Sequence, residues 1–522
     1  MSFRLTYATM FNPPEAMHTA FDLALADVRT GLGTRHGLFL NGDDVSRAET
    51  QRLVSPIDTS LVLGEFALAT PADVDTAVRS AQSAWPAWRA RSAADRAALL
   101  RRVADVMESR VYAIAAALAL EVGKNRMEAM GEAQETVDFF RQYADDFEKA
   151  HGFDVPLPND PLDGIVSTNR SVLRPYGVWA VIAPFNYPLA LMGGPTAAAL
   201  VTGNVVVAKG SAHTPWAGRL LADCLRDAGL PRGVFQLVRG ATDDVGRALA
   251  EHPQVAGLTF TGSVAVGRRL LALSVSGHYP RPCVAEMGGK NPCIVTEHAD
   301  LDAAATGIAR SAYGLSGQKC SALSRLYVHD KVADALVERL QERIAAITVG
   351  DPTARANWIG PVNNTAAYAN YSRWIAQLRD AGAVLHAGGE VMTGGDLARG
   401  YYVSPVLAEA PEQHPLWRQE LFLPVLMMLR VGSKEEAMQR ANDSDVGLTA
   451  GFYGSAEEVD WFHEHIEAGV TYANRAQGAT TGAWPGYQPF GGWKGSGSTG
   501  KAIASFYYLP LYLREQSRTV VR

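Results

Sequence analysis

Cys320 is the side chain in the sequence best suited to nucleophilic chemistry. It lies in Gly317-Gln-Lys-Cys-Ser-Ala, a loop of small residues with the cationic Lys319 beside it. A cysteine attacks as its thiolate, which cationic or dipolar surroundings favour. Cysteine is also among the residues most often buried for packing alone, as the apolar contexts of the other three cysteines suggest. The local sequence therefore leaves two interpretations of Cys320 open, a nucleophile and an inert packing residue.

Two polar residues stand in segments where a ligand could meet them. Glu286 precedes paired glycines in Glu286-Met-Gly-Gly-Lys. Because glycine has no side chain, a carboxylate beside these residues can face a cleft. Asn186, in Pro184-Phe-Asn-Tyr-Pro, is an amide among apolar residues, and its burial is costly unless it finds partners. Taken singly, Glu286 is better explained as a surface or helix-cap glutamate, and Asn186 as a turn residue before proline.

The segment Gly262-Ser-Val-Ala-Val-Gly267 could bind phosphate. Small residues at the start of a helix let backbone N–H groups approach a pyrophosphate. The dinucleotide fingerprint G-x-G-x-x-G is absent, however, and Arg268 stands where a P-loop has lysine. A plain turn between a strand and a helix explains this segment equally well.

These residues lie in a pattern typical of a doubly wound α/β fold. From Gly177 onward, short β-branched runs alternate with helical segments, which predicts parallel strands with a ligand crevice at their carboxyl ends. The pattern predicts strands at 205–207, 234–238 and 256–260 and helices at 214–228, near 243–251 and from about 264. Ahead of these, helices are predicted after Ser92 and over 126–147.

A second α/β alternation follows Cys293, with strands predicted at 325–328 and 425–431. Two α/β domains are therefore expected to meet near Glu286. The segment 156–167 has several Pro, Asp and Asn residues, which indicates a connector or a turn that leaves the domain.

Composition excludes several classes of protein. With 522 residues, 47% hydrophobic and 20% charged, the chain is expected to fold into two to four globular domains rather than a fibrous or disordered protein. A formal net charge of −6 argues against a dedicated nucleic-acid or anionic-membrane binder. Four cysteines without a CxxC or Cys/His cluster argue against a disulfide framework or a metal site. With no secretory signal and with Pro and Gly interrupting the most apolar stretch, at 177–210, a cytoplasmic location is expected.

Five motifs in a fixed order change the interpretation of the single residues. They are Pro184-Phe-Asn-Tyr-Pro, Phe260-Thr-Gly-Ser, Glu286-Met-Gly-Gly-Lys, Gly317-Gln-Lys-Cys and Gln488-Pro-Phe-Gly-Gly. The ordered set resembles the aldehyde dehydrogenase superfamily from about Val54 to the C-terminus. The resemblance implies a Rossmann-like NAD(P)-binding domain (1–157 and 177–285), an α/β catalytic domain (286–498) and a small β oligomerisation element (158–176 and 499–522).

The same resemblance implies a homo-oligomer, dimeric or larger. The apolar, aromatic run from Ser505 to Arg514 agrees with this, because such a segment would be an aggregation hazard if it were left exposed.

The resemblance also implies a thioester mechanism. Cys320 would attack an aldehyde carbonyl, and the side-chain amide of Asn186 with the backbone N–H of Cys320 would hold the oxyanion. After hydride transfer to NAD or NADP, Glu286 would act as the general base for the water that hydrolyses the thioester. The product would be a carboxylic acid.

Cofactor contacts carried over by position number seven: Lys209, Ser211, Gly262, Ser263, Gly267, Glu420 and Phe422. Two departures from the family pattern accompany them. Ala212 replaces the glutamate that would accept hydrogen bonds from the ribose hydroxyls and repel a 2′-phosphate. NADP is therefore expected to bind as well as NAD. Leu423 replaces the glycine that usually follows Phe422, which changes the local backbone.

Several motifs resemble the branch of the family that oxidises L-glutamate γ-semialdehyde, the open form of 1-pyrroline-5-carboxylate. They are Glu121-Val-Gly-Lys-Asn, Gly317-Gln-Lys-Cys-Ser-Ala-Leu-Ser-Arg and Thr481-Gly-Ala-Trp-Pro-Gly-Tyr-Gln-Pro-Phe. The substrate contacts then expected are Glu135, Tyr187, Ser321, Gly482, Ala483 and Phe490. Pro485 and the ending Trp493-Lys-Gly-Ser-Gly depart from the branch pattern.

Three alternatives to this substrate assignment remain from the sequence. They are a dehydrogenase of another aliphatic aldehyde or semialdehyde, a CoA-acylating dehydrogenase or transferase, and a non-catalytic binding or structural protein that kept the fold. Glu286 argues against CoA acylation, and the intact set of Cys320, Glu286 and Asn186 argues against loss of catalysis.

Overall fold

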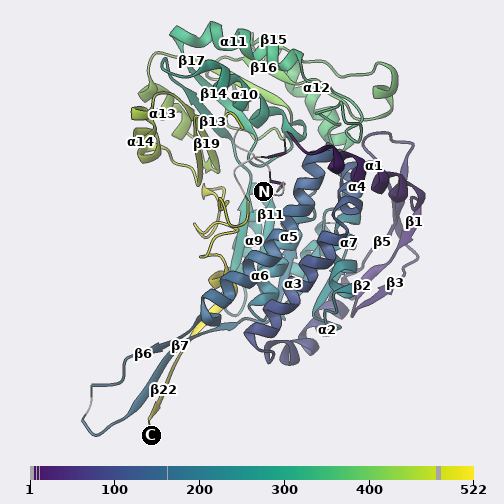
Figure 1. The fold of residues 1–522 in the computed structure, drawn as a ribbon, viewed down its shortest axis with the longest axis vertical. Helices are drawn as coiled ribbons and strands as arrows, with labels where there is room; N and C mark the ends of the chain where they lie inside the picture. The colour runs from purple at the N-terminus through teal and green to yellow at the C-terminus, as the bar shows by residue number, and fades with distance from the viewer. Residues whose placement is uncertain are drawn as a thin grey trace.

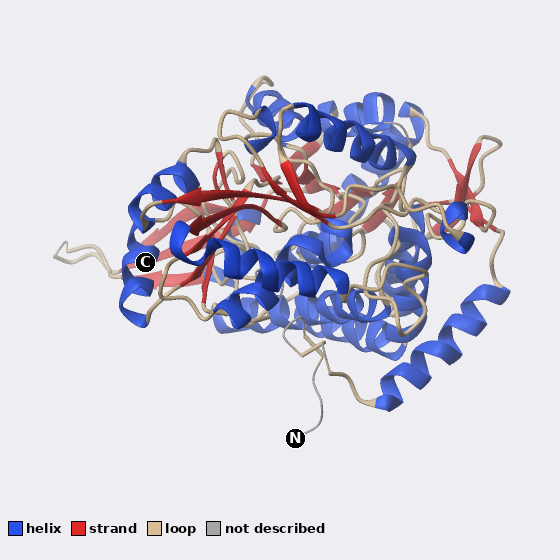
Figure 2. Cartoon of the chain, turned by 90° about the horizontal axis from the view of Figure 1, so that it is seen from above, coloured by secondary structure: helices blue, strands red, loops and turns tan. Residues whose placement is uncertain are grey.

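Two seven-stranded sheets form the body of the protein in a computed structural model, which describes residues 5–6, 9–10, 12–161, 163–240, 242–477 and 484–521 (Figure 1). Seen from above, the strands lie between layers of helices (Figure 2). This is the expected α/β fold, with a cofactor-type sheet first in the chain and a second α/β sheet after it.

The first sheet has the strand order β12-β11-β8-β9-β10-β2-β3. Its strands are β2 (Leu38–Leu40), β3 (Asp43–Val45), β8 (Val178–Ile182), β9 (Val205–Lys209), β10 (Phe235–Val238), β11 (Val255–Gly262) and β12 (Cys283–Met287). The five strands from β8 to β12 are parallel, while β2 and β3 pair antiparallel at one edge. The order along the chain reverses between β8 and β11, and ligands bind at the carboxyl ends of strands beside such a reversal.

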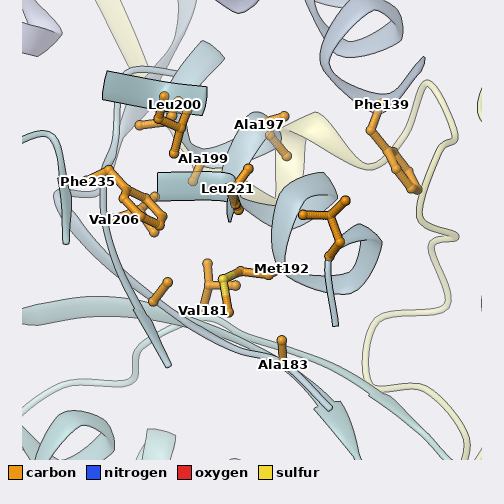
Figure 3. Packing of buried hydrophobic residues seen from close by; sticks show 14 of the residues in the cluster. Phe139, Val181, Ala183, Met192, Ala197, Ala199, Leu200, Val206, Leu221 and Phe235 are labelled. Atoms are coloured by element: carbon orange, nitrogen blue, oxygen red, sulfur yellow. The ribbon is translucent and has the colours of Figure 1, made fainter. Parts of the chain in front are cut away.

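Helices cover both faces of this sheet because its strands are apolar on both sides. All five residues of β9 are buried, as expected for a central parallel strand. The covering helices are α2 (Pro71–Arg89), α6 (Ala190–Val201), α7 (Pro215–Asp227), α8 (Arg247–Glu251) and α9 (Val264–Val275). Figure 3 shows Met192, Ala197 and Leu200 of α6 among the apolar side chains that pack with Val181 and Val206 of the sheet.

The second sheet has the order β15-β16-β17-β14-β13-β19-β20, parallel except for β15. Its strands are β13 (Asn291–Val295), β14 (Leu323–His329), β15 (Val384–Ala387), β16 (Val406–Glu409), β17 (Val425–Val431), β19 (Thr449–Tyr453) and β20 (Val470–Ala473). The helices after β12 are α10 (Leu301–Tyr313), α11 (Asp330–Ala345), α12 (Thr365–Asp380), α13 (Lys434–Asn442) and α14 (Ala456–His465).

The predicted strands and helices are present with small shifts of their ends. The helix after Ser92 is α3 (Ala93–Ser109), and Ser92 Oγ accepts a hydrogen bond from the N–H of Asp95. The helix predicted over 126–147 is α5 (Arg126–Lys149), which begins at the N-cap Asn125. Its neighbour α4 (Val111–Val122) ends at Gly123, whose φ of 88° is a left-handed conformation that favours glycine.

An arm of three strands leaves the body of the molecule (Figure 1). It consists of β6 (Asp154–Leu157), β7 (Ser167–Pro175) and β22 (Leu513–Val521), paired antiparallel with β7 in the centre. The segment predicted to be a connector joins β6 to β7. β6 therefore belongs to the arm, although the expected first domain ran to residue 157.

The remaining elements pack around the body. They are α1 (Glu15–Thr30), β1 (Thr34–His36), β4 (Thr50–Val54), β5 (Val62–Ala67), β18 (Val446–Gly447) and β21 (Trp493–Lys494). Among the described residues, no helix combines the length and apolar character needed to cross a membrane.

Candidate active site

Cys320 lies where two cavities meet. A cavity of about 900 Å³ opens along the carboxyl ends of β8, β9, β11 and β12, and a smaller one of about 70 Å³ lies next to α5. Both are lined by Cys320, with Leu191 of α6 as the other shared residue. A group at Cys320 can therefore meet one ligand from each side.

The large cavity lies at the strand reversal of the first sheet. Its walls include the segments after β8 and β9, the end of β11 and the start of α9, and Met287 and Gly288 at the end of β12. Ser263 is the N-cap of α9, and its Oγ accepts from the N–H of Val266. The positive end of this helix dipole therefore faces the cavity, which suits an anionic phosphate group.

Six of the seven expected cofactor residues line this cavity: Lys209, Ser211, Gly262, Ser263, Glu420 and Phe422. Gly267 does not line it. A Cβ at Gly267 would lie 2.3 Å from Met287 Sδ, so the glycine lets α9 pack closely on β12. The structure thus places Gly267 in helix packing.

Two ionisable groups in the large cavity have shifted pKa values. Burial, together with the charge of Arg239, lowers the pKa of Lys209 to about 8. Burial raises the pKa of Glu420 to about 7, against the effects of the Gly289 N–H, which donates to its Oε1, and of nearby Lys290. Both groups can therefore change charge near neutral pH.

The loop that carries Cys320 is held by contacts on both sides. Asn291 Nδ2 donates to the carbonyls of Cys320 and Ala322, at 2.7 and 2.8 Å. Gly317 has a φ of +68°, and a Cβ there would lie 2.2 Å from the carbonyl oxygen of Leu423. Only glycine allows this approach, which brings the segment of Glu420 and Phe422 against the cysteine loop.

The Cys320 thiol is neutral at ordinary pH. Burial and the carboxyl groups of Glu420 and Glu286 raise its pKa to about 12, while the N–H groups of Ser321 and Cys320 act in the opposite direction. These two N–H groups stabilise the negative charge that develops on the sulfur during attack, although the surroundings as a whole disfavour the resting thiolate.

Asn186 lies beside Cys320 in the large cavity, in the loop between β8 and α6. It is 3% exposed, and its Nδ2 donates to the carbonyl of Gln318 at 3.0 Å. An amide NH₂ has two N–H bonds, so the second is left for a ligand oxygen. The sequence-based interpretation of Asn186 as a simple turn residue does not account for this burial.

Glu286 is buried near the end of β12 and lines neither cavity. Burial raises its pKa well above the ordinary value, and the N–H of Gly492 donates to the carboxylate. Its Oε2 has no hydrogen-bond partner among the described residues. A carboxyl group of raised pKa and incomplete hydrogen bonding is suited to proton transfer.

The small cavity contains four of the six expected substrate residues: Glu135, Tyr187, Ser321 and Phe490. They come from α5, the loop before α6, the cysteine loop and the segment after β20. Gly482 and Ala483 lie outside the described residues. Trp484 and Pro485, which immediately follow them, line this cavity.

A buried ion pair beside the small cavity was not anticipated from the sequence. Lys124 Nζ lies 2.5 Å from Glu132 Oε2, and both side chains are 0% exposed. Glu132 Oε1 also accepts from the N–H groups of Leu189 and Ala190, where α6 begins. Lys124 Nζ lies 3.3 Å from the centre of the Tyr187 ring. The pair therefore holds the loop that carries Asn186 and Tyr187.

Two further contacts shape the small cavity. Lys319, in its wall, pairs with Glu128 Oε1 at 3.0 Å. Trp484 donates from Nε1 to Asp138 Oδ2 at 2.7 Å, which joins the segment after β20 to α5.

One signal in the sequence could have found Glu128 and Glu132. Together with Glu135 they recur at spacings of four and three, which places three carboxylates along one side of α5. Nothing local to Trp484 indicated its partner.

The chain is similar to known proteins over most of its length. The sequence pattern described as the aldehyde dehydrogenase family matches residues 44–516. The chain is 34% identical over 511 residues to the 1-pyrroline-5-carboxylate dehydrogenase of Bacillus cytotoxicus, covering 97% of this chain and 96% of that protein. It is also 34% identical over 496 residues to the Staphylococcus aureus protein of the same name, covering 94% of each.

Among solved structures, the fold is similar to that of a 1-pyrroline-5-carboxylate dehydrogenase from Thermus with bound NAD. The TM-score is 0.92 at 32% sequence identity, and the match covers 100% of this chain and 99% of the other.

Proposed function

Because the chain belongs to the aldehyde dehydrogenase family, we propose that it oxidises L-glutamate γ-semialdehyde to L-glutamate with NAD or NADP as oxidant. One observation carries the proposal: Cys320 forms a wall shared by a cavity suited to a dinucleotide and a small cavity with polar side chains. In the small cavity, the carboxylate of Glu135 suits the substrate ammonium and the hydroxyl of Ser321 suits its carboxylate.

The first half of the reaction uses Cys320 and Asn186. The sulfur attacks the aldehyde carbon and loses its proton to solvent, while the N–H groups of Ser321 and Cys320 stabilise the negative charge on sulfur. The free N–H of Asn186 Nδ2 then donates to the oxygen that becomes negative. A nicotinamide dinucleotide in the large cavity supplies the hydride acceptor, and the substrate remains on Cys320 as a thioester.

The second half uses Glu286. Its side chain lines neither cavity, so it must rotate toward Cys320 to reach a water molecule there. The carboxylate takes a proton from this water as the oxygen attacks the thioester carbon. The sulfur leaves as the thiolate, which is protonated again, and the carboxylic acid is released.

The large cavity fits a dinucleotide that carries or lacks a 2′-phosphate. Lys209, Ser211 and Ala212 line it after β9, and Ala212 brings no carboxylate to repel a phosphate. We expect both NAD and NADP to bind, and the Kd of each can be measured by quenching of protein fluorescence. Ala212→Glu should weaken NADP selectively, and equal weakening of both dinucleotides would contradict this role for Ala212.

The substrate assignment is tested by initial rates with 1-pyrroline-5-carboxylate, succinic semialdehyde and propanal. We expect the highest kcat/KM for 1-pyrroline-5-carboxylate, because Glu135 and Ser321 recognise charges that propanal lacks. Oxidation of another aliphatic aldehyde is the second candidate, favoured by the bulky Trp484 in the wall of the small cavity. A preference for propanal would establish that candidate and overturn the first.

We further propose that the arm makes contacts between subunits. Val155, Leu157, Val520 and Val521 of the arm are 42–60% exposed, which leaves apolar surface uncovered in the single chain. Light scattering should give a mass of at least a dimer, and a monomer at micromolar concentration would contradict this role.

A further inference from the structure

A third cavity, of about 300 Å³, lies where the arm meets the body. Its walls include Trp85, Arg89, Arg174, Arg514, Glu515 and Gln516, from α2, β7 and β22. None of these residues lines either cavity at Cys320. The proposed reaction makes no use of this cavity.

Two of its three arginines face each other across the arm. Arg174 of β7 and Arg514 of β22 are direct partners in the antiparallel pair. Like charges directly opposite on neighbouring strands destabilise a sheet. A neighbouring Arg–Arg position, Arg170 opposite Arg518, has a compensating acid, because Arg170 Nε lies 2.8 Å from Asp154 Oδ1.

No such acid compensates the arginines of the cavity. Within the described part of the chain, no carboxylate forms an ion pair with the guanidinium groups of Arg89, Arg174 or Arg514. Glu515, the acidic residue in the wall, accepts a hydrogen bond from Ser171 Oγ instead. Three positive charges therefore converge on one hollow in a protein whose net charge is −6.

Aromatic contacts hold two of these arginines in place. The guanidinium carbon of Arg89 lies 4.6 Å from the centre of the Trp85 ring, and that ring is fixed by a hydrogen bond from Nε1 to the carbonyl of Gly203. The guanidinium carbon of Arg514 lies 5.5 Å from the centre of the Tyr176 ring. Arginines oriented in this way keep N–H groups free for a ligand.

We propose that this cavity binds a small polyanion, a molecule with two or more phosphate or carboxylate groups, between Arg89, Arg174 and Arg514. Each guanidinium offers a planar pair of N–H donors that fits the oxygens of such a group. The bound anion relieves the repulsion between Arg174 and Arg514. It also links α2 to β7 and β22, so binding stabilises the root of the arm.

Calorimetric titration tests the proposal with pyrophosphate and citrate as probes. The enzyme is first saturated with NAD, so that pyrophosphate cannot enter the large cavity, and NaCl holds the ionic strength constant. We expect one probe site per chain and a rise in Tm with probe concentration. The two probes separate phosphate from carboxylate ligands.

Arg174→Gln with Arg514→Gln should weaken probe binding by at least about tenfold, because two charge-assisted contacts are lost. Arg518→Gln is the matched control, since Arg518 lies on β22 but outside the cavity. If the double variant fails to fold, Arg89→Gln on the exposed face of α2 takes its place.

Several results would overturn the proposal. One is equal binding by the wild type and the double variant, and another is an equal loss in Arg518→Gln. A third is that neither probe binds and that the double variant forms a smaller assembly than the wild type by light scattering. The cavity would then bind a second copy of the chain. These measurements use no aldehyde substrate, so their outcome does not depend on the proposed substrate.

Discussion

The two cavities that meet at Cys320 are built in different ways. The large one follows from one sheet, because parallel strands end at a common edge where the order of β8 and β11 reverses. The small one is assembled from α5, the start of α6, the cysteine loop and the segment after β20. The large cavity therefore depends on local motifs in a regular scaffold, whereas the small one depends on buried polar contacts between distant segments.

The largest effect is expected where the two cavities join. Cys320→Ala removes the proposed nucleophile, and turnover should fall by about four orders of magnitude. Dinucleotide binding and Tm should stay at their wild-type values, because the large cavity keeps its other walls. Cys224→Ala, at a buried cysteine of α7, is the control and should stay active. Oxidation of the aldehyde at the wild-type rate by Cys320→Ala would exclude the thioester mechanism.

Glu286→Gln should slow thioester hydrolysis by about 10²- to 10³-fold, since an amide cannot accept the proton of water. Stopped-flow absorbance should show one rapid equivalent of reduced dinucleotide per chain, followed by slow turnover. Hydroxylamine, which attacks a thioester without a base, should restore fast turnover. A first turnover as slow as the later ones would mean that Glu286 acts before the thioester forms.

Glu132→Gln tests the small cavity alone. Its Lys124 partner would be left buried with a weakened contact, so the free energy of unfolding should fall by about 3 kcal/mol. Misplacement of Asn186 should lower kcat by about 10- to 100-fold, while the Kd of NAD is unchanged.

Glu121→Gln is the matched control for this variant. Glu121 is also a buried glutamate that accepts from backbone N–H groups at a helix start, those of Trp216 and Ala217 at α7. This variant should lose stability without a specific loss of kcat. Equal kinetic effects of the two variants would contradict the positioning of the Asn186 loop by Glu132.

Trp484→Phe removes the hydrogen bond to Asp138 but keeps an aromatic wall. We expect KM for the aldehyde to rise by about tenfold, because the wall of the small cavity loses the hydrogen bond that fixes it to α5, with little change in kcat. Trp493→Phe, at an exposed tryptophan outside both cavities, should change neither value. A loss of kcat with unchanged KM would contradict the role of Trp484 in substrate binding.

The smallest effect concerns the pH dependence of dinucleotide binding. The pKa of Glu420 is raised to about 7, so its carboxylate is ionised above and protonated below this pH. We expect the ionised form to accept hydrogen bonds from ribose hydroxyls, so the Kd of NAD should fall by about threefold between pH 6 and pH 8. Glu420→Gln should remove this dependence, and a Kd that still follows pH in the variant would assign the titration to another group, such as Lys209.

The first sheet and its cavity could largely be predicted from the sequence. The run 205–207 with its flanking helices predicted buried parallel strands, and the carboxyl ends of such strands define the crevice. Lys209, Ser211 and Ser263 accordingly line the cavity. Gly267 was expected at the cofactor but does not line the cavity. The sequence shows that the residue is small but not what it packs against, which here is Met287.

The small cavity could be predicted only in part. Glu135, Tyr187, Ser321 and Phe490 were found through family motifs and do line it. Glu132 and Asp138 were missed. The spacing of Glu132 with Glu128 and Glu135 along α5 was the one signal for Glu132, whereas an aspartate on a helix has the same local signature whether it faces solvent or a buried tryptophan. The pairing of β7 with β22 was expected only through the family resemblance, because it joins distant parts of the chain, and β6 was not expected in the same sheet.

The sequence by itself determined the reactive groups and the regular scaffold, because residue types, periodicity and small-residue turns act over a few neighbouring positions. The tertiary structure alone decided which of these groups meet and what their pKa values are. Glu132 reaches Leu189 across 57 residues, and Trp484 reaches Asp138 across 346. Such contacts, and the burial that raises the pKa of Glu286 and Cys320, exist only after distant segments have packed together, since desolvation depends on everything that surrounds a group.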